Sequence, residues 1–242
     1  WKSRLEAAGV ALTDRKAIGI DGLTVSATNN LISASGSELL SNGLVAFDAA
    51  NITAKGRIAA NGNVTLFASQ NGNFGGTIVS ADAVRLTSGN LTVDGAIEAA
   101  NYIGLTAQGK TTLAGASQVI SGGQLALTGS DAIVTAGTLA SAGKMAINGS
   151  ASLQLGGIIQ SDQALTVRGA DVAILGDVAS NAGFNIQSNN IVSVAGRLTS
   201  LGQGSVQANS IIVEANAAEN KPGVVYTAQN LALTAVNDIA NT

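Results

Sequence analysis

The sequence contains no cysteine and no histidine. These absences exclude cysteine nucleophiles, metal sites built from thiolates or imidazoles, Ser-His-Asp triads and histidine pH switches. Disulfides are excluded as well, so the cysteine content does not indicate a redox compartment. We expect neither a metal site nor a bound cofactor.

Aromatic residues, proline and charge are also scarce. Aromatics make up 3% of the 242 residues, charged residues 11%, and there is one proline. Charged residues usually reach about a quarter of a globular chain, so this composition is not that of a typical enzyme. The 12 basic and 15 acidic residues give a net charge of −3, which argues against nucleic acid as a partner.

Hydrophobic residues nevertheless make up 46% of the chain, so its core must consist mainly of Ala, Val, Ile and Leu. No apolar run reaches the length needed to cross a membrane as a helix, because small polar residues or glycine interrupt each one. The chain starts at Trp1 with no signal-peptide pattern, which we interpret as a mature or excised segment.

Two sequence markers recur with a mean period of 20 residues. The first is a glycine that closes a short apolar run, and it occurs at Gly36, Gly56, Gly75, Gly95, Gly115, Gly137, Gly156, Gly176 and Gly196. The second is a small residue that follows an aliphatic one, at Ser41, Ala60, Ser80, Ala99, Ser121, Ser141, Ser161, Ser180 and Ser200. Because both markers keep one period, the chain is a repeat protein.

Within each repeat the apolar pattern has a period of two, which predicts strands. The predicted inward pairs are Val45/Phe47, Val64/Leu66, Val84/Leu86, Ile103/Leu105, Leu125/Leu127, Met145/Ile147, Leu165/Val167 and Phe184/Ile186. A unit of short strands without a helical stretch predicts an all-β fold, a right-handed parallel β-helix of about ten coils. Stacked coils favour outward ladders of Thr, Asn and Gln and disfavour stacked like charges. A leucine-rich repeat is rejected because its L-x-x-L-x-L-x-x-N core is missing.

Two regions depart from the period. Residues 1–18 form a basic N-terminal segment or an irregular first coil, and residues 19–242 carry the β-helix repeats. Residues 216–223 contain the single proline and are predicted to project as a loop. Neither end looks like a dedicated cap, so we interpret the chain as part of a longer rod that continues into further repeats.

Candidate binding residues are the aromatics predicted to lie outside the core. Phe67 occupies an outward position, Tyr102 is predicted in a turn, and Phe74 lies in an irregular segment. Exposed aromatic rings can stack on a sugar or contact a receptor, although packing over a coil corner is the alternative. An outward apolar stripe is a second candidate face, with Leu40, Ala59, Val79, Ile120 and Ala140.

Catalysis by a carboxylate pair was weighed and set aside. Asp94 and Glu98 straddle one closing glycine and Asp171 and Asp177 another, but no acids stack in one column on successive turns, as a polysaccharide-cleaving β-helix would need. We interpret both pairs as solvated turns and predict no catalytic residue. Asp177 and Arg197 each follow a closing glycine one turn apart, which predicts neighbouring side chains.

The units IAANGNVTLFASQNGNFGG, LASAGKMAINGSASLQLGG and VASNAGFNIQSNNIVSVAG resemble the filamentous-haemagglutinin-type repeats of two-partner-secreted exoproteins. These proteins include adhesins and contact-dependent growth-inhibition toxins. The resemblance covers about residues 20–215. It implies secretion through an outer-membrane β-barrel transporter and a location outside the outer membrane, at the bacterial cell surface. It carries over no functional residue, because such repeats define shape.

The sequence therefore favours a non-enzymatic stalk or adhesive segment of a large secreted exoprotein, with a face that could bind a receptor or a glycan. Two alternatives remain open. One is a β-helix lyase or hydrolase acting on polysaccharides, and the other is the receptor-binding section of a growth-inhibition toxin.

Overall fold

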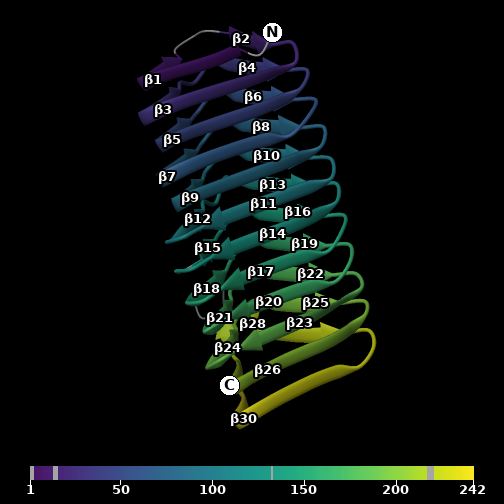
Figure 1. Cartoon of the computed structure of the whole chain (residues 1–242). Helices are drawn as coiled ribbons and strands as arrows, with labels where there is room; N and C mark the ends of the chain where they lie inside the picture. Colours follow the sequence, from purple (N-terminus) through teal and green to yellow (C-terminus); the bar gives the residue numbers. More distant parts are fainter. Residues whose placement is uncertain (1–2, 13–15, 132, 217–220) are drawn as a thin grey trace.

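The computed structural model describes residues 3–12, 16–131, 133–216 and 221–242, and these residues form an elongated parallel β-solenoid (Figure 1). The described residues contain strands and turns but no helix, so none could cross a membrane as a helix. The predicted all-β solenoid, with about ten turns of about 20 residues, is confirmed.

Each turn contributes to two sheets that stack along the axis. Sheet A has 17 strands: β1 (Ser3–Leu12), β3 (Gly22–Ser33), β5 (Leu44–Ala54), β7 (Val64–Phe74), β9 (Ala83–Val93), β11 (Tyr102–Ala107), β12 (Thr111–Leu113), β14 (Gln124–Gly129), β15 (Ile133–Thr135), β17 (Met145–Gly149), β18 (Ser152–Leu155), β20 (Leu165–Gly169), β21 (Asp171–Ile174), β23 (Gly183–Ser188), β24 (Ile191–Val194), β26 (Gln203–Val213) and β30 (Leu231–Asn241).

Sheet B has 11 short strands, one in each turn from β2 to β29. They are β2 (Lys16–Gly19), β4 (Glu38–Ser41), β6 (Arg57–Ala60), β8 (Thr77–Ser80), β10 (Ala96–Ala99), β13 (Gln118–Ser121), β16 (Thr138–Ser141), β19 (Ile158–Ser161), β22 (Asp177–Ser180), β25 (Arg197–Ser200) and β29 (Val224–Thr227). All pairings in both sheets are parallel, because each strand pairs with its equivalent in the next turn.

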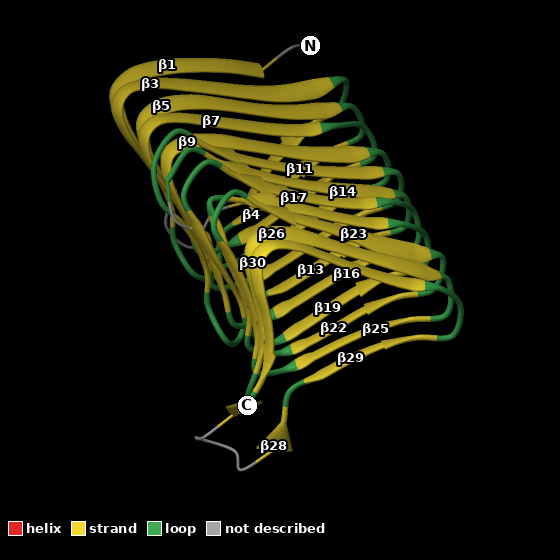
Figure 2. Ribbon diagram, turned by 90° about the horizontal axis from the view of Figure 1, so that it is seen from below, coloured by secondary structure: helices red, strands yellow, loops and turns green. Residues whose placement is uncertain are grey.

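Sheet A wraps around two faces of the solenoid, and sheet B closes the third (Figure 2). The long strands β3, β5, β7 and β9 turn the corner between the two faces of sheet A, with an irregularity of register at the bend. From β11 onward, most turns use two separate strands for these faces.

The core is a set of aliphatic columns that run along the axis. Every predicted inward pair from Val45/Phe47 to Phe184/Ile186 is buried, and all but one of these residues are 2% exposed or less, Phe184 being 4%. Removal of one such side chain from water contributes about 1.5–3 kcal/mol. The columns therefore stabilise the solenoid without disulfides.

Asparagines form a ladder at the bend of sheet A. The amide of Asn51 donates to Oδ1 of Asn30 at 3.2 Å, Asn71 donates to Asn51 at 2.9 Å, and Asn90 donates to Asn71 at 3.1 Å. The backbone N–H of Lys110 then donates to Oδ1 of Asn90 at 3.1 Å. These bonds confirm the expected outward asparagine ladder and satisfy polar groups where the strands bend.

A second column, of small residues, ends each strand of sheet B. The small-residue marker from Ser41 to Ser200 is buried at every turn. Its serines bond to the backbone of the loop that follows and of the equivalent loop one coil earlier. Oγ of Ser180, for instance, donates either to the carbonyl oxygen of Gln163, in the earlier loop, or to that of Gly183, in the following loop, and lies 2.7 Å from each. The serine hydroxyl thus replaces water for turn groups that are buried.

The segments that break the period have the following structure. Strand β1 pairs in parallel with β3, and β2 pairs with β4, so both belong to the stacked sheets. Near the other end, β27 (Ala215–Asn216) pairs antiparallel with β28 (Lys221–Pro222), so the chain leaves the solenoid as a hairpin before returning as β29. Residues 217–220 of the predicted loop lie outside the described residues.

Candidate functional site

Phe67 lies on the outer surface of sheet A, as predicted. It belongs to β7 and is 42% exposed, with Asp48 and Thr87 as its register partners on the neighbouring strands. A large ring held at this exposure on a flat sheet can contact a ligand face to face.

Tyr102 is not in a turn but is the first residue of β11. Its ring lies over Gly104, because a Cβ added there would be 2.8 Å from the ring. The guanidinium carbon of Arg85, on the preceding neighbour strand β9, is 5.1 Å from the ring centroid, within the range of a cation–π contact. Tyr102 is half-buried, so part of its ring fills the hollow left by the glycine.

The prediction that Phe74 lies outside the core is wrong. Its side chain is 1% exposed, and it stands in register with Ala54 and Val93, both of which are core residues. The segment around it is the regular end of β7 and not a loop. Phe74 therefore cannot contact a ligand, and its large side chain takes part in core packing.

The two remaining candidate aromatics, Phe67 and Tyr102, lie on the same face of sheet A but on strands that are not adjacent. Arg85 lies on the strand between those of Phe67 and Tyr102. Four residues along the strand and two strand spacings separate the rings' backbones by about 16 Å. We call Phe67, Arg85 and Tyr102 the aromatic face.

The predicted apolar stripe lies on the outer surface of sheet B. Parallel register aligns Leu40, Ala59 and Val79 on successive strands, and Ile120 and Ala140 two turns further on, but Glu98 interrupts the column between them. Shallow hollows follow the column from Ile18 to Gln160. The sequence located the stripe but did not indicate the hollows along it.

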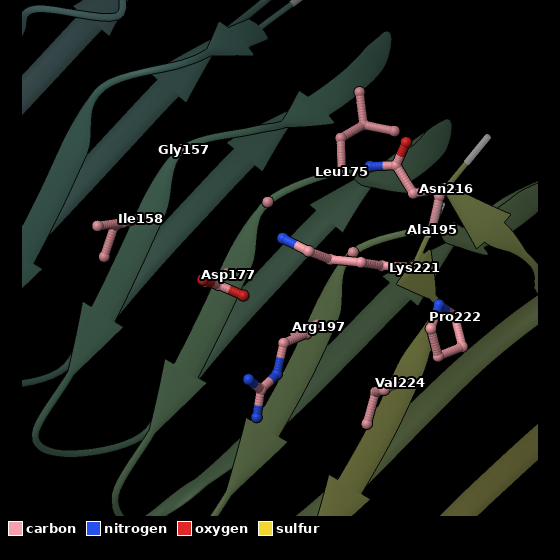
Figure 3. A pocket seen from close by; sticks show the side chains of 12 residues that line it. Gly157, Ile158, Leu175, Asp177, Ala195, Arg197, Asn216, Lys221, Pro222 and Val224 are labelled. Carbon is pink, nitrogen blue, oxygen red and sulfur yellow. The ribbon is translucent and has the colours of Figure 1, made fainter. Parts of the chain in front are cut away.

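A further hollow lies beside the hairpin, where the hairpin meets sheet B (Figure 3). It has a volume of about 510 Å³ and lies against β19, β22 and β25. Its charged lining consists of Asp177 and Arg197 on the sheet and Lys221 on the hairpin, and Ile158 (50% exposed) and Leu175 (44%) line its apolar part. The groove thus offers both charge signs next to exposed aliphatic carbon.

Asp177 and Arg197 are register partners on β22 and β25, as their spacing predicted. Within the described part of the chain, the ion pair found lies elsewhere, between Nζ of Lys16 and Oε2 of Glu38 at 3.0 Å. Both side chains of the register pair point from the sheet toward the groove. They are placed to meet a ligand or a surface that carries opposite charges.

The carboxylates weighed for catalysis do not gather at this groove as pairs. Asp171 lies on β21 of sheet A, whereas Asp177 lies on β22 of sheet B. Asp94 lies in the turn before β10, and Glu98 lies on that strand. In the ranges that the structure describes, no three acidic residues converge as metal ligands would.

The groove was missed because its two halves are far apart in the sequence. The period break at residues 216–223 and the neighbouring charges of Asp177 and Arg197 were both visible. The two signals could be combined only with the knowledge that the chain leaves the solenoid at the same corner at which Asp177 and Arg197 lie.

The fold and these surfaces define the chain as a parallel β-solenoid with an excursion near one end. No protein-family model, curated protein or solved structure matches it.

Proposed function

We propose that the protein is a β-helical stalk segment of a large secreted cell-surface exoprotein, non-catalytic, with a face that binds a receptor or a glycan. The observation that carries the proposal is the unbroken parallel register of sheet B from β2 to β29. Eleven strands at about 4.8 Å per step give a rod about 48 Å long. A continuous rod suits the separation of two ends at a fixed distance.

The secreted, surface location and the outer-membrane β-barrel transporter rest on the resemblance of the repeats to filamentous-haemagglutinin-type exoproteins. A chain without cysteine suits transport of an unfolded polypeptide, since it cannot be trapped by wrong disulfides.

Further coils stacked on β30 belong to the same proposal. Ile239 continues the column of Ile211, which is buried, yet Ile239 is 54% exposed. The outer edge of β30 also offers backbone groups to another parallel strand. One more coil would cover both.

The aromatic face is the surface that we assign to a receptor or glycan. Phe67 and Tyr102 present ring faces, and Arg85 adds a cation beside them. Sugar rings stack on aromatic faces, and their hydroxyls accept hydrogen bonds from guanidinium groups.

The test is binding of the fluorescently labelled chain to intact bacterial and epithelial cells. We expect saturable binding whose affinity falls at least tenfold in a Phe67→Ala/Tyr102→Ala variant. Ile191→Ala serves as the matched control, because Ile191 is equally exposed (42%) on the other face of sheet A. Saturable binding that survives the double change would move the site elsewhere, and absence of saturable binding to every cell type would reject the recognition role.

A screen of uronate and neutral glycan polymers, with and without Ca²⁺, addresses the enzymatic alternative. We expect no turnover. Turnover that is lost in Asp94→Asn or Glu98→Gln would replace the stalk proposal with a polysaccharide-processing enzyme.

A further inference from the structure

The outer surface of sheet B carries two columns of side chains, one on each side of the buried column. The first outer column, in turn order, is Lys16, Glu38, Arg57, Thr77, Ala96, Gln118, Thr138, Ile158, Asp177, Arg197 and Val224. The second is Ile18, Leu40, Ala59, Val79, Glu98, Ile120, Ala140, Gln160, Ala179, Thr199 and Tyr226, read from the same pairings.

The second column exposes aliphatic and aromatic carbon at both ends and at its centre. Ile18 is 62% exposed, Ile120 is 40% exposed and Tyr226 is 56% exposed. Glu98 is its one charged member, and it stands next to the turn edge, where its carboxylate reaches solvent. A flat apolar column of this length suits a partner with the same periodicity.

Four of the five charged residues of the first column lie in pairs of opposite sign at equal distances from β13, the sixth of the eleven strands, whereas the mirror position of Lys16 is held by Val224. Glu38 is in the second turn and Arg197 in the tenth, while Arg57 is in the third and Asp177 in the ninth. A two-fold axis along β13 would place each residue opposite its mirror turn in a second copy. Glu38 would then face Arg197, and Arg57 would face Asp177, which pairs opposite charges in each case.

Other registers lose this complementarity. A shift by one turn in one direction places Glu38 opposite Asp177 and Lys16 opposite Arg197. A shift in the other direction places Arg57 opposite Arg197. Like charges in direct opposition disfavour an interface, so only the axis along β13 satisfies both pairs.

A parallel arrangement of two rods is disfavoured for a different reason. A two-fold axis along the solenoid places the first column of one copy opposite the second column of the other at the same turn. Arg57 would then face Ala59 and Asp177 would face Ala179, so that no charge of the first column meets an opposite charge. The axis along β13 pairs four of these charges and leaves two charged residues, Lys16 and Glu98, opposite the uncharged Val224 and Ala140. Burial of a charge without a partner is costly.

The face is large enough for a specific dimer. The face is four residues wide at about 3.3 Å per residue and ten strand spacings long at about 4.8 Å each, so its projected area is about 630 Å². The accessible surface is larger, because side chains project from the sheet. A standard interface buries about 800 Å² of accessible surface per partner. Figure 2 shows the strands of sheet B stacked side by side in one layer, a shape that permits face-to-face packing.

We propose that a second copy of this chain is the partner of sheet B, and that the two rods pack antiparallel about a two-fold axis along β13. Ile120 of each copy meets Ile120 of the other at the centre, with the ion pairs of Arg57 and Glu38 on both sides. The hairpin groove of one copy, with Asp177 and Arg197, then lies against the second and third turns of its partner. The aromatic face on sheet A stays open in both copies.

Sedimentation equilibrium of the whole chain with charge-reversed variants tests the pairing. We expect the unmodified chain to form dimers that weaken as salt rises. Arg57→Glu alone and Asp177→Arg alone each place like charges opposite twice, so each should weaken the dimer at least tenfold. An equimolar mixture of the two variants should restore it, because a heterodimer contains one pair of each polarity, both attractive. Lys110→Glu, at the bend of sheet A, is the matched control and should leave dimerisation unchanged.

Cross-linking tests the geometry, because the natural chain has no cysteine. Ile120→Cys should cross-link to itself through a short bismaleimide, whereas Thr106→Cys on sheet A should not. A mixture of Glu38→Cys and Arg197→Cys should give a linked heterodimer, and neither variant alone should.

Three results would overturn the proposal. The first is an unmodified chain that stays monomeric at about 100 µM, a concentration at which weak interfaces already form. The second is an equimolar mixture of Arg57→Glu and Asp177→Arg that does not regain dimerisation. The third is a cross-link between residue 38 of one copy and residue 38 of the other. Association that resists Arg57→Glu and is lost in Ile239→Lys would show end-to-end stacking through β30 in place of sheet B. Circular dichroism of every variant confirms that the β-fold is kept.

Discussion

The ring of Phe74 lies against Gly72, two residues earlier on β7, and occupies space that a side chain at Gly72 would need. A Cβ on Gly72 would be 2.7 Å from Cε2 of the ring. Gly72 stands in an inner column between Ile52 and Leu91 of the adjacent turns, both of which are buried. One large side chain thus fills its own place and also the empty place of Gly72 in the neighbouring inner column.

Phe74→Ala should lower the free energy of unfolding by about 3–5 kcal/mol, because it leaves a cavity next to a position without a side chain. Urea unfolding followed by circular dichroism measures the change. Gly72→Ile combined with Phe74→Ala should recover part of the loss, since it restores an aliphatic residue to the column. Phe67→Ala is the surface control and should stay within about 0.5 kcal/mol of the natural chain. Equal effects at both phenylalanines would contradict the core assignment.

Ser180→Ala should cost about 1–3 kcal/mol. The change removes the hydroxyl that serves buried backbone groups of the turn, and an unpaired buried polar group is expensive. Alanine is sterically acceptable in this column, because Ala60 and Ala99 occupy it in other turns. The same unfolding measurement therefore isolates the hydrogen bonds. An unchanged midpoint would mean that water replaces the hydroxyl.

Thr111→Val should stabilise the protein by about 1 kcal/mol. Oγ1 of Thr111 is buried and has no hydrogen-bond partner in the described structure, and its register partners are Leu91 and Ile133. Valine has nearly the same shape and removes the unsatisfied hydroxyl. A rise in the thermal midpoint would support this, whereas a fall would show that the hydroxyl has a partner in solution.

Gly157→Ala should destabilise the solenoid by about 2–3 kcal/mol. Gly157 has a φ of +69°, and a Cβ there would overlap the carbonyl oxygen of Gly137 in the turn before. Gly115 gives the contrast, because a Cβ there would meet nothing within 4 Å. Gly115→Ala should be neutral or slightly stabilising, since it restricts the unfolded chain. Similar losses at both glycines would show that alanine is poorly tolerated at turns in general.

Much of the fold followed from the sequence, because stacking repeats the same side-chain environment in every turn. The inner positions of Val45 and Ile186, many turns apart, could be predicted from one period and one alternation. The same alternation also predicts an inward position for Phe74, because Phe74 is in register with the buried Val93. The glycines around Phe74 concealed this signal, because Gly72 leaves its inner position without an apolar side chain. The ring of Phe74 fills that position, and the pattern of apolar residues in the sequence does not show this.

The candidate binding surfaces were less predictable. Phe67 was identified because an outward aromatic breaks the small polar pattern. The surroundings of Tyr102 depend on contacts with Gly104 and Arg85 that no spacing rule describes. The groove beside the hairpin depends on which corner the chain leaves, and a break in period shows where in the sequence this happens but not on which face.

The parallel register of sheet B makes the length of the rod a quantity that changes in whole steps. Loss of one turn between β6 and β22 would shorten it by about 4.8 Å. Asp177 and Arg197 would move together by one turn, so both would still find Arg57 and Glu38 opposite them, about an axis displaced by half a step. The length of the rod can therefore change through the gain or loss of repeats while the charge pairing between two copies stays the same.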